Sequence, residues 1–325
     1  MFSRSSMFKW MKWLLGLAIL LYLFFVLRDH LKQDLSWSDF PSISALNWWA
    51  LIFVFFLMPL NWALEALKWL RMMRRNGENW SFRQAFNCVM AGTSTAIFTP
   101  NRLGDVAGRM VLVSGENRED AFWATVLCNS SQLSALLVLG IPGLFFFIQL
   151  VPDSGLEFSS TAVFLASAGL TMIVLLFFYR ASVIIPVIID LLPLKTWREY
   201  LQKTLAVLSN ASLSDLNVLL LLSMLRTLTY AFQYFLTILF FGVKLGLAET
   251  VASILAVYLL KTVVPYLPAM GILVRAELSL WVFSAFTDEL TLILAASFLI
   301  WVINVVLPAI WGYFLILTTN IKGKS

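Results

Sequence analysis

Charged residues are scarce in this sequence of 325 residues. Only 13% of them are Asp, Glu, Lys or Arg, and 60% are hydrophobic, whereas a soluble globular chain has roughly 25% charged and 45–50% apolar residues. A soluble fold could not bury that much apolar surface. The composition therefore excludes a soluble enzyme and predicts a protein of the lipid bilayer.

The residue types that bind metals or act as catalytic bases are also rare. The sequence has one histidine, His30, and two cysteines, Cys88 and Cys128, which lie in apolar segments without metal-ligand spacing. Such cysteines are typical of buried structural thiols. The sequence also lacks a nucleotide-binding loop and an Asp-rich metal motif. We therefore predict no catalytic residue, no metal site and no cofactor.

Segments of alternating apolar and polar residues, which a transmembrane β-barrel requires, are absent. Instead the apolar residues form long uncharged runs, typical of membrane-spanning helices, at 121–152, 158–179, 227–243 and 290–321. The apolar run 13–27 follows a basic start and precedes Arg28 rather than a small-residue cleavage site, so we predict a retained first helix. The predicted fold is all-α.

Basic residues indicate the orientation of the chain. They precede the first helix and follow both the second helix, 48–70, and the last span, 290–318. Lys and Arg concentrate on the cytoplasmic side of membrane proteins. We therefore predict a multi-pass protein of a bacterial-type inner (plasma) membrane with both termini in the cytoplasm. The formal charge of +5 is explained by these flanking residues, so no nucleic-acid partner is expected.

The segment 84–101 is uncharged but rich in Gly, Ser, Thr and Asn, and it ends in Pro100. If it crossed the membrane, Arg102 and Arg109 would lie outside. A re-entrant pair of half-helices avoids this, because irregular backbone is tolerated where protein or water surrounds it. The segment 248–268 ends similarly. The chain is thus predicted to have about six full spans plus two re-entrant helical hairpins.

The two halves of the chain follow one plan when Ser81 is aligned with Leu247: a long helix, a short turn, an uncharged half-helix, a break and a basic residue. The long helix runs inward in one half and outward in the other, which predicts an inverted repeat of the kind many transporters use. The predicted single membrane domain, 1–325, divides into an N-terminal helix and outer loop (1–46), a first repeat (47–180), a cytoplasmic connector with a surface helix (181–213) and a second repeat (214–325). The breaks contain Pro100, Gly104, Pro265, Pro268 and Gly271.

Several ionisable residues interrupt the apolar segments. Such groups are costly in a bilayer and usually face a cavity or a partner, and arginine can hold a phosphate with two parallel hydrogen bonds. We therefore predict a site for an anionic or zwitterionic headgroup. Its candidate residues are Glu65, Arg102, Asp105, Arg109, Arg226, Lys261, Arg275 and Glu277.

Each candidate also has a purely structural interpretation. Arg102 and Arg109 could lie at headgroup level, Asp105 could cap a helix or pair with Arg109, and Glu65 could form an ordinary helix-end pair with Lys68. The polar stripe at 129–134 could line a cavity or join two helices by hydrogen bonds.

The first break resembles the lysylphosphatidylglycerol synthase/flippase transmembrane family, in the residues Gly77, Ser81, Phe82, Ala85 and Thr99-Pro100-Asn101-Arg102-Leu103-Gly104-Asp105 with Arg109. The second break is similar at Pro265, Pro268, Gly271 and Glu277 but lacks the family's multiple glycines. The resemblance covers roughly residues 8 to 318. It implies at most the lipid-translocating half of such proteins, because the soluble synthase domain does not follow in this sequence.

The leading hypothesis is the translocation of a lipid or a lipid-linked headgroup between leaflets, with membrane lipids as partners. Two alternatives stay open. The first is an integral-membrane enzyme that acts on a lipid phosphate. The second is a non-transporting partner in envelope assembly, and the protein partners considered are a second copy of the chain and a separate lipid-modifying enzyme.

Overall fold

A computed structural model describes residues 41–76, 79–97, 99, 103–151, 159–191, 211–263 and 271–318. Within these residues the chain is helical and contains no β-strand, which confirms the all-α prediction. The main helices are α2 (Trp48–Met73), α3 (Phe82–Ala96), α4 (Leu103–Val111), α5 (Arg118–Leu150), α6 (Ser160–Leu191), α8 (Leu213–Phe240), α9 (Leu247–Val263), α10 (Gly271–Phe283), α11 (Leu290–Trp301) and α12 (Leu307–Thr318). Short turns of 3-10 helix lie at Ile43–Ala45, Arg74–Asn76 and Gly115–Asn117.

Five stretches in the described part of the chain are long and apolar enough to cross a membrane: Trp48–Met73, Gly115–Leu150, Ser160–Ile184, Leu213–Phe240 and Leu290–Thr318. This is the multi-pass architecture that the apolar runs predict. The expected first span, 13–27, lies outside the described residues, and so does the expected surface helix of the connector, 197–213, as far as residue 210.

Local sequence signals set the helix ends. Ser81 and Ser212 each accept a hydrogen bond from the backbone N–H three residues on, and Gln84 and Asp215 return the bond, so both helices begin with a capping box. At the other end of α8, Gly242 has a φ of 78°, a conformation that glycine adopts without steric cost. This residue turns the chain out of α8 toward α9.

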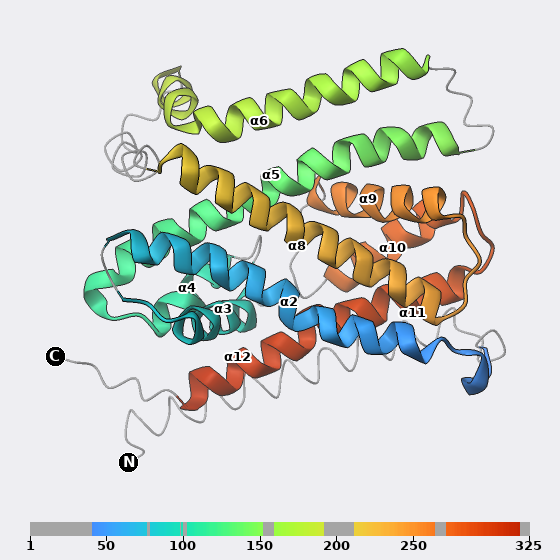
Figure 1. Ribbon diagram of the computed structural model, residues 1–325, viewed down its shortest axis with the longest axis horizontal. Coiled ribbons are helices and arrows are strands. Elements are labelled where there is room, and N and C mark those ends of the chain that lie inside the picture. Colours follow the sequence, from blue (N-terminus) through green and yellow to red (C-terminus); the bar gives the residue numbers. More distant parts are fainter. Residues whose placement is uncertain are drawn as a thin grey trace.

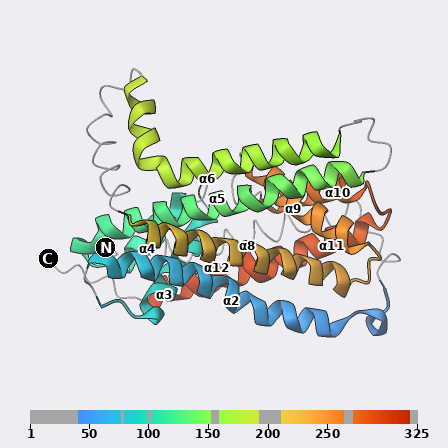
Figure 2. The ribbon, with the colours of Figure 1, turned by 45° about the horizontal axis from the view of Figure 1, so that its top comes forward.

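The long helices lie side by side, and helices α3, α4, α9 and α10 form two hairpins at opposite ends of the bundle (Figure 1). Hairpin α3–α4 lies where α2 ends and α5 begins. Hairpin α9–α10 lies where α8 ends and α11 begins. The same separation is visible in a second view (Figure 2). The two hairpins therefore enter the bundle from opposite ends, as an inverted repeat requires; their re-entrant position in a bilayer stays a prediction.

Hairpin α3–α4 is held together by unusually close backbone contact. A Cβ added to Gly108 would collide with the backbone of Ala91 and Gly92 and with the Thr95 side chain, and one added to Gly104 would collide with the Thr95 carbonyl. Small residues at such crossings let two helix backbones approach within a membrane. The glycines of the first break thus shape the packing of the hairpin.

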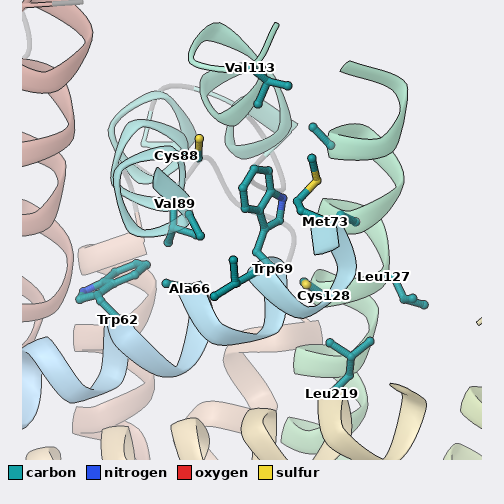
Figure 3. Packing of buried hydrophobic residues seen from close by; sticks show 14 of the residues in the cluster. Trp62, Ala66, Trp69, Met73, Cys88, Val89, Val113, Leu127, Cys128 and Leu219 are labelled. Atoms are coloured by element: carbon teal, nitrogen blue, oxygen red, sulfur yellow. The ribbon is translucent and has the colours of Figure 1, made fainter. Parts of the chain in front are cut away.

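The largest apolar cluster lies between α2, α3, α5 and α8 (Figure 3). Trp69 of α2 is fully buried there, and its ring is directed toward Cys88 of α3 and Val113, which follows the end of α4. Its indole N–H donates to Thr125 Oγ1 at 3.1 Å. Cys88 and Cys128 are free, buried thiols, as predicted. A second apolar cluster surrounds hairpin α9–α10, α8 and α11.

Two features of the helices differ from the sequence prediction. Helix α6 continues past Arg180 to Leu191 through residues that are mostly apolar, although they include Pro186. The last span contains a π-helical segment, Val302–Val306, between α11 and α12. This segment brings Asn304 to α2, where its Oδ1 accepts a 2.9 Å hydrogen bond from Asn61 Nδ2.

Candidate functional site

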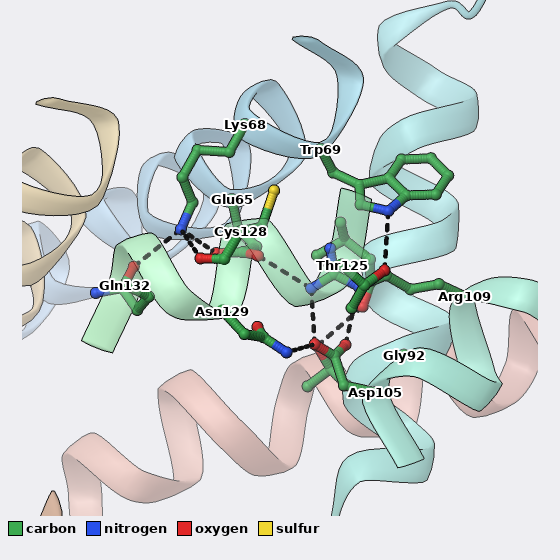
Figure 4. A network of polar contacts seen from close by, with 12 residues as sticks. Glu65, Lys68, Trp69, Gly92, Asp105, Arg109, Thr125, Cys128, Asn129 and Gln132 are labelled. Atoms are coloured by element: carbon green, nitrogen blue, oxygen red, sulfur yellow. Dashed lines mark hydrogen bonds and ion pairs between the residues drawn. The ribbon is translucent and has the colours of Figure 1, made fainter. Parts of the chain in front are cut away.

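A group of five ionisable side chains lies in the interior of the bundle. We call Glu65, Lys68, Asp105, Arg109 and Arg226 the charged cluster. Glu65 of α2 is its centre: Oε1 lies 3.0 Å from Arg109 Nη2, and Oε2 lies 2.8 Å from Lys68 Nζ and 3.0 Å from Arg226 Nη1. One carboxylate therefore connects three cations from three helices (Figure 4 shows Glu65, Lys68 and Arg109).

Arg109 is clamped by a second carboxylate. Its Nε and Nη2 donate to the two oxygens of Asp105, at 2.9 and 2.8 Å. The four-residue spacing on α4 places these side chains on one face of the helix, and Gly92 of α3 leaves the space that Asp105 occupies. Asn129 Nδ2 donates to Asp105 Oδ2 at 3.4 Å (Figure 4). Arg109 thus ties hairpin α3–α4 to α2.

Lys68 is fully buried and points away from hairpin α3–α4 (Figure 4). Besides the ion pair with Glu65, its Nζ donates to Ser223 Oγ at 3.0 Å, to Gln132 Oε1 at 3.1 Å and to the Cys128 carbonyl at 3.4 Å. These acceptors belong to α5 and α8. Lys68 therefore links α2 to both helices through satisfied hydrogen bonds.

Arg226 is the most exposed member of the charged cluster, with a side-chain exposure of 10%. Its Nη1 donates to Gln132 Oε1 at 3.2 Å and its Nε to the Asn61 carbonyl at 3.3 Å. The guanidinium also lies over the Trp62 ring, 4.9 Å from the centroid. Arg226 is consequently the group of the cluster that a ligand from outside would meet first.

The charges of the cluster do not cancel. Three cations and two carboxylates leave one positive charge in excess within the described residues. Glu65, Lys68, Asp105 and Arg109 are each at most 2% exposed. Buried charges are tolerated only when they are paired and hydrogen-bonded, and this network meets most of that demand.

Arg275 of α10 lies apart from the charged cluster. It is 1% exposed and is surrounded by the rings of Tyr230, Tyr234 and Tyr258, with ring centroids 5.2, 5.6 and 5.3 Å from its Cζ. Tyr230 follows Arg226 by one turn of α8, so the charged cluster and the rings around Arg275 both include residues of that helix. Among the described residues, the predicted basic residues Arg109 and Arg226 thus belong to the charged cluster, and Arg275 lies in separate, aromatic surroundings.

The remaining predicted residues lie elsewhere. Glu277 is exposed and Lys261 is half-buried. Gly104 belongs to α4, and Gly271 is the first residue of α10. Arg102, Pro100, Pro265 and Pro268 lie outside the described residues.

Sequence reasoning marked the polar stripe that contains Asn129 and Gln132 but overlooked other polar partners of the charged cluster. Lys68 was considered only as a helix-end partner of Glu65, although it is buried among three helices. Ser223 and Asn61 each interrupt an apolar run, a signal that could have marked them. The polar stripe on α5 joins helices at two positions: Gln132 donates to Thr227 Oγ1 at 2.8 Å, and Ser131 hydrogen-bonds Ser223 at 2.9 Å.

No group of three or more His, Cys, Asp and Glu residues able to hold a metal ion occurs in the part of the chain that the structure describes. The donors of the charged cluster instead fit an oxyanion: guanidinium and ammonium groups bind phosphate and carboxylate oxygens through charge-assisted hydrogen bonds.

A comparison with known protein families gives a match that covers most of the chain. Residues 13–312 match the family described as the lysylphosphatidylglycerol synthase TM region, which confirms the resemblance found at the first break. Neither curated proteins nor solved structures gave a match.

Proposed function

Because the chain belongs to the lysylphosphatidylglycerol synthase TM family, a family of membrane domains linked to lipid headgroup modification or flipping, we propose that it moves a lipid between leaflets. The group that it recognises is the anionic or zwitterionic headgroup. In this proposal the protein is a transporter rather than an enzyme and uses no cofactor, and it acts in a bacterial-type inner membrane with both termini in the cytoplasm.

The observation that carries the proposal is the charged cluster itself, in which three cations and two carboxylates are buried inside the bundle. Removing a charge from water costs several kcal/mol per ion, and hydrophobic replacements of buried ion networks are often neutral or stabilising. A membrane protein therefore gains no evident stability from holding five charges there. Ionisable residues within membrane segments more commonly serve substrate or ion pathways.

The geometry supports a way for a headgroup to enter the network. Arg226 shares Glu65 Oε2 with Lys68, and Arg109 uses the other oxygen of Glu65. An oxyanion that pairs with Arg226 would leave Glu65 with two cationic partners. The phosphate can thus exchange with a carboxylate without leaving that carboxylate unpaired, which keeps the barrier to entry and release low.

The two hairpins support passage between leaflets. They enter from opposite ends of the bundle, and the charged cluster contacts hairpin α3–α4 through Asp105 and Arg109. In transporters built from inverted repeats, rearrangement of one repeat against the other exposes a central site to each side in turn. A headgroup bound at Arg226 would follow such a rearrangement.

Translocation is tested with the purified protein in liposomes that contain fluorescent phosphatidylglycerol or phosphatidylethanolamine, by chemical quenching of the outer leaflet. We expect leaflet exchange above that of protein-free liposomes, reduced at least tenfold in Arg226→Gln. Lys244→Gln removes the same formal charge from an exposed position and is expected to keep the wild-type rate. Absence of exchange for every lipid would favour the enzyme or the assembly-partner hypothesis.

A further inference from the structure

Arg275 is held in an aromatic surround that we call the tyrosine cage, formed by Tyr230 and Tyr234 of α8 and Tyr258 of α9. The three ring centroids lie within 5.6 Å of the Arg275 Cζ. Aromatic faces attract a guanidinium through their quadrupole. The tyrosine cage therefore positions Arg275 firmly but supplies no negative charge.

The guanidinium lacks the partners that its burial demands. Nε and Nη1 of Arg275 are inaccessible to solvent, and neither donates a hydrogen bond within the described residues. No carboxylate in the described part of the chain forms an ion pair with Arg275, and Glu277, two residues on, is exposed. A buried cation without hydrogen-bonded counter-charge is costly.

Arg109 provides the contrast. It is also 1% exposed, but Asp105 and Glu65 both pair with it, at 2.8 and 3.0 Å. The same chain thus pairs one buried arginine with two carboxylates and surrounds another with three tyrosines and, among the described residues, no paired carboxylate. Cation–π attraction offsets part of the desolvation of Arg275 but leaves its Nε and Nη1 without a hydrogen bond, whereas Nη1 alone lacks one in Arg109.

Two of the cage tyrosines donate their hydroxyl groups to acceptors outside the guanidinium. Tyr234 donates to Ser279 Oγ at 2.8 Å, and Tyr258 donates to the Tyr230 carbonyl at 3.1 Å. These bonds fix the rings of Tyr234 and Tyr258, and Nε and Nη1 of Arg275 stay available as donors to a ligand. The positive charge of Arg275 and the paired donors of its planar guanidinium both favour an oxyanion as the ligand.

We infer that Arg275 and the tyrosine cage form a second anion site. The phosphate of a lipid headgroup binds at this site and at Arg226 one after the other during its passage. The lipid source is favoured because the site lies within the helical bundle, between α8, α9 and α10, rather than on a polar surface. This inference rests on the proposed function for the direction of travel: the charged cluster lies at hairpin α3–α4, and the cage lies at hairpin α9–α10.

The test measures thermal unfolding of the full chain in a detergent free of phosphate and phospholipid. Three additives are compared: dihexanoylphosphatidylglycerol, dihexanoylglycerol without phosphate, and sodium phosphate. For wild type we expect dihexanoylphosphatidylglycerol at about 100 times its Kd to raise the midpoint by about 5 °C, with no rise from dihexanoylglycerol. A rise with sodium phosphate alone would assign the same site to free phosphate.

The decisive variant is Arg275→Met, with Lys244→Met as the control for the loss of one charge at an exposed residue. Without additive, Arg275→Met is expected to unfold no earlier than wild type, because an unpaired buried cation is replaced by an apolar side chain. The rise caused by dihexanoylphosphatidylglycerol is expected to fall to less than half. An earlier midpoint with an undiminished rise would overturn the inference and make Arg275 a structural cation.

If Arg275→Met fails to fold, Arg275→Lys replaces it, since lysine keeps the charge but loses the two-pronged donor. We expect a Kd for dihexanoylphosphatidylglycerol about tenfold weaker, and an unchanged Kd would overturn the inference. The liposome assay separates this inference from the proposed function. If binding depends on Arg275 but no leaflet exchange occurs, the proposed translocation is contradicted and the second anion site is not. If exchange occurs but binding does not depend on Arg275, the second anion site is contradicted and translocation is not.

Discussion

Glu65 Oε1 lies 3.0 Å from Arg109 Nη2, so an ion pair joins the long helix α2 to the short hairpin α3–α4. Both side chains are at most 2% exposed. The hairpin is therefore attached to the bundle by charge as well as by its glycine-mediated packing, and a change at either residue should affect both stability and headgroup binding.

Removing Arg109 should be strongly destabilising. Arg109→Met leaves Asp105 buried with only Asn129 as a hydrogen-bond donor among the described side chains, and breaking a buried ion pair from one side costs about 3–5 kcal/mol. We expect a clearly lower midpoint of thermal unfolding in detergent.

The control for this change is Arg71→Met. Arg71 pairs with Asp215 at 3.0 Å but has a side-chain exposure of 48%, so its loss should cost at most about 1 kcal/mol. Equal losses of stability in the two variants would contradict the importance of burial for the charged cluster.

Glu65 and Lys68 should be coupled in a double-mutant cycle. Glu65→Gln leaves three cations against Asp105, and Lys68→Gln removes the excess charge, whereas the double variant keeps one positive charge in excess. We expect the double variant to be more stable than the sum of the single changes predicts, by about 0.5–3 kcal/mol. Midpoints and leaflet-exchange rates of the four proteins check this.

If the excess positive charge supports transport, the double variant should also exchange lipid faster than Lys68→Gln. A rate at or below that of Lys68→Gln would argue that the individual side chains, and not the net charge, set translocation.

Gly108→Ala should push helices α3 and α4 of the hairpin apart and lower stability. Its Cβ would meet the Ala91 carbonyl and the Thr95 side chain, and crowding in a packed interior costs typically 1–3 kcal/mol. Gly169→Ala is the matched control: Gly169 also lies in a helix, and a Cβ there meets nothing within 4 Å. Alanine at this position should be neutral or stabilising, because alanine favours the helix by about 1 kcal/mol over glycine. A Gly108→Ala midpoint equal to that of Gly169→Ala would contradict the close contact.

The buried pair Asn61 and Asn304 should behave asymmetrically. Each single change to Leu strands the partner amide, which costs about 1–3 kcal/mol, whereas replacing both partners can be nearly neutral. We therefore expect Asn61→Leu with Asn304→Leu to unfold later than at least one of the single variants. Additive destabilisation in the double variant would show that the 2.9 Å bond contributes little.

The positions of helices could be predicted where apolar runs are long. The predicted second helix, 48–70, agrees with α2, Trp48–Met73, because hydropathy alone defines such a span. The π-helical segment Val302–Val306 could not be predicted, because Asn304 gains its partner on α2 only after the two helices pack. The sequence indicated both Arg226 and Arg275 because each interrupts an apolar run. That they have different surroundings depends on which helices pack against each residue.

The sequence by itself determined that the protein is a multi-pass helical membrane protein with breaks in two corresponding places. Scarce charge, long apolar runs and Gly and Pro residues each influence the structure of their own segment, whatever that segment packs against. Only the tertiary structure decided the partners of each charge. Glu65 joins cations that are distant in the sequence, whereas Arg275 meets three aromatic rings from two other helices. The reason is physical: the cost of a buried charge depends on the groups within a few ångströms of it, and packing between helices selects those groups.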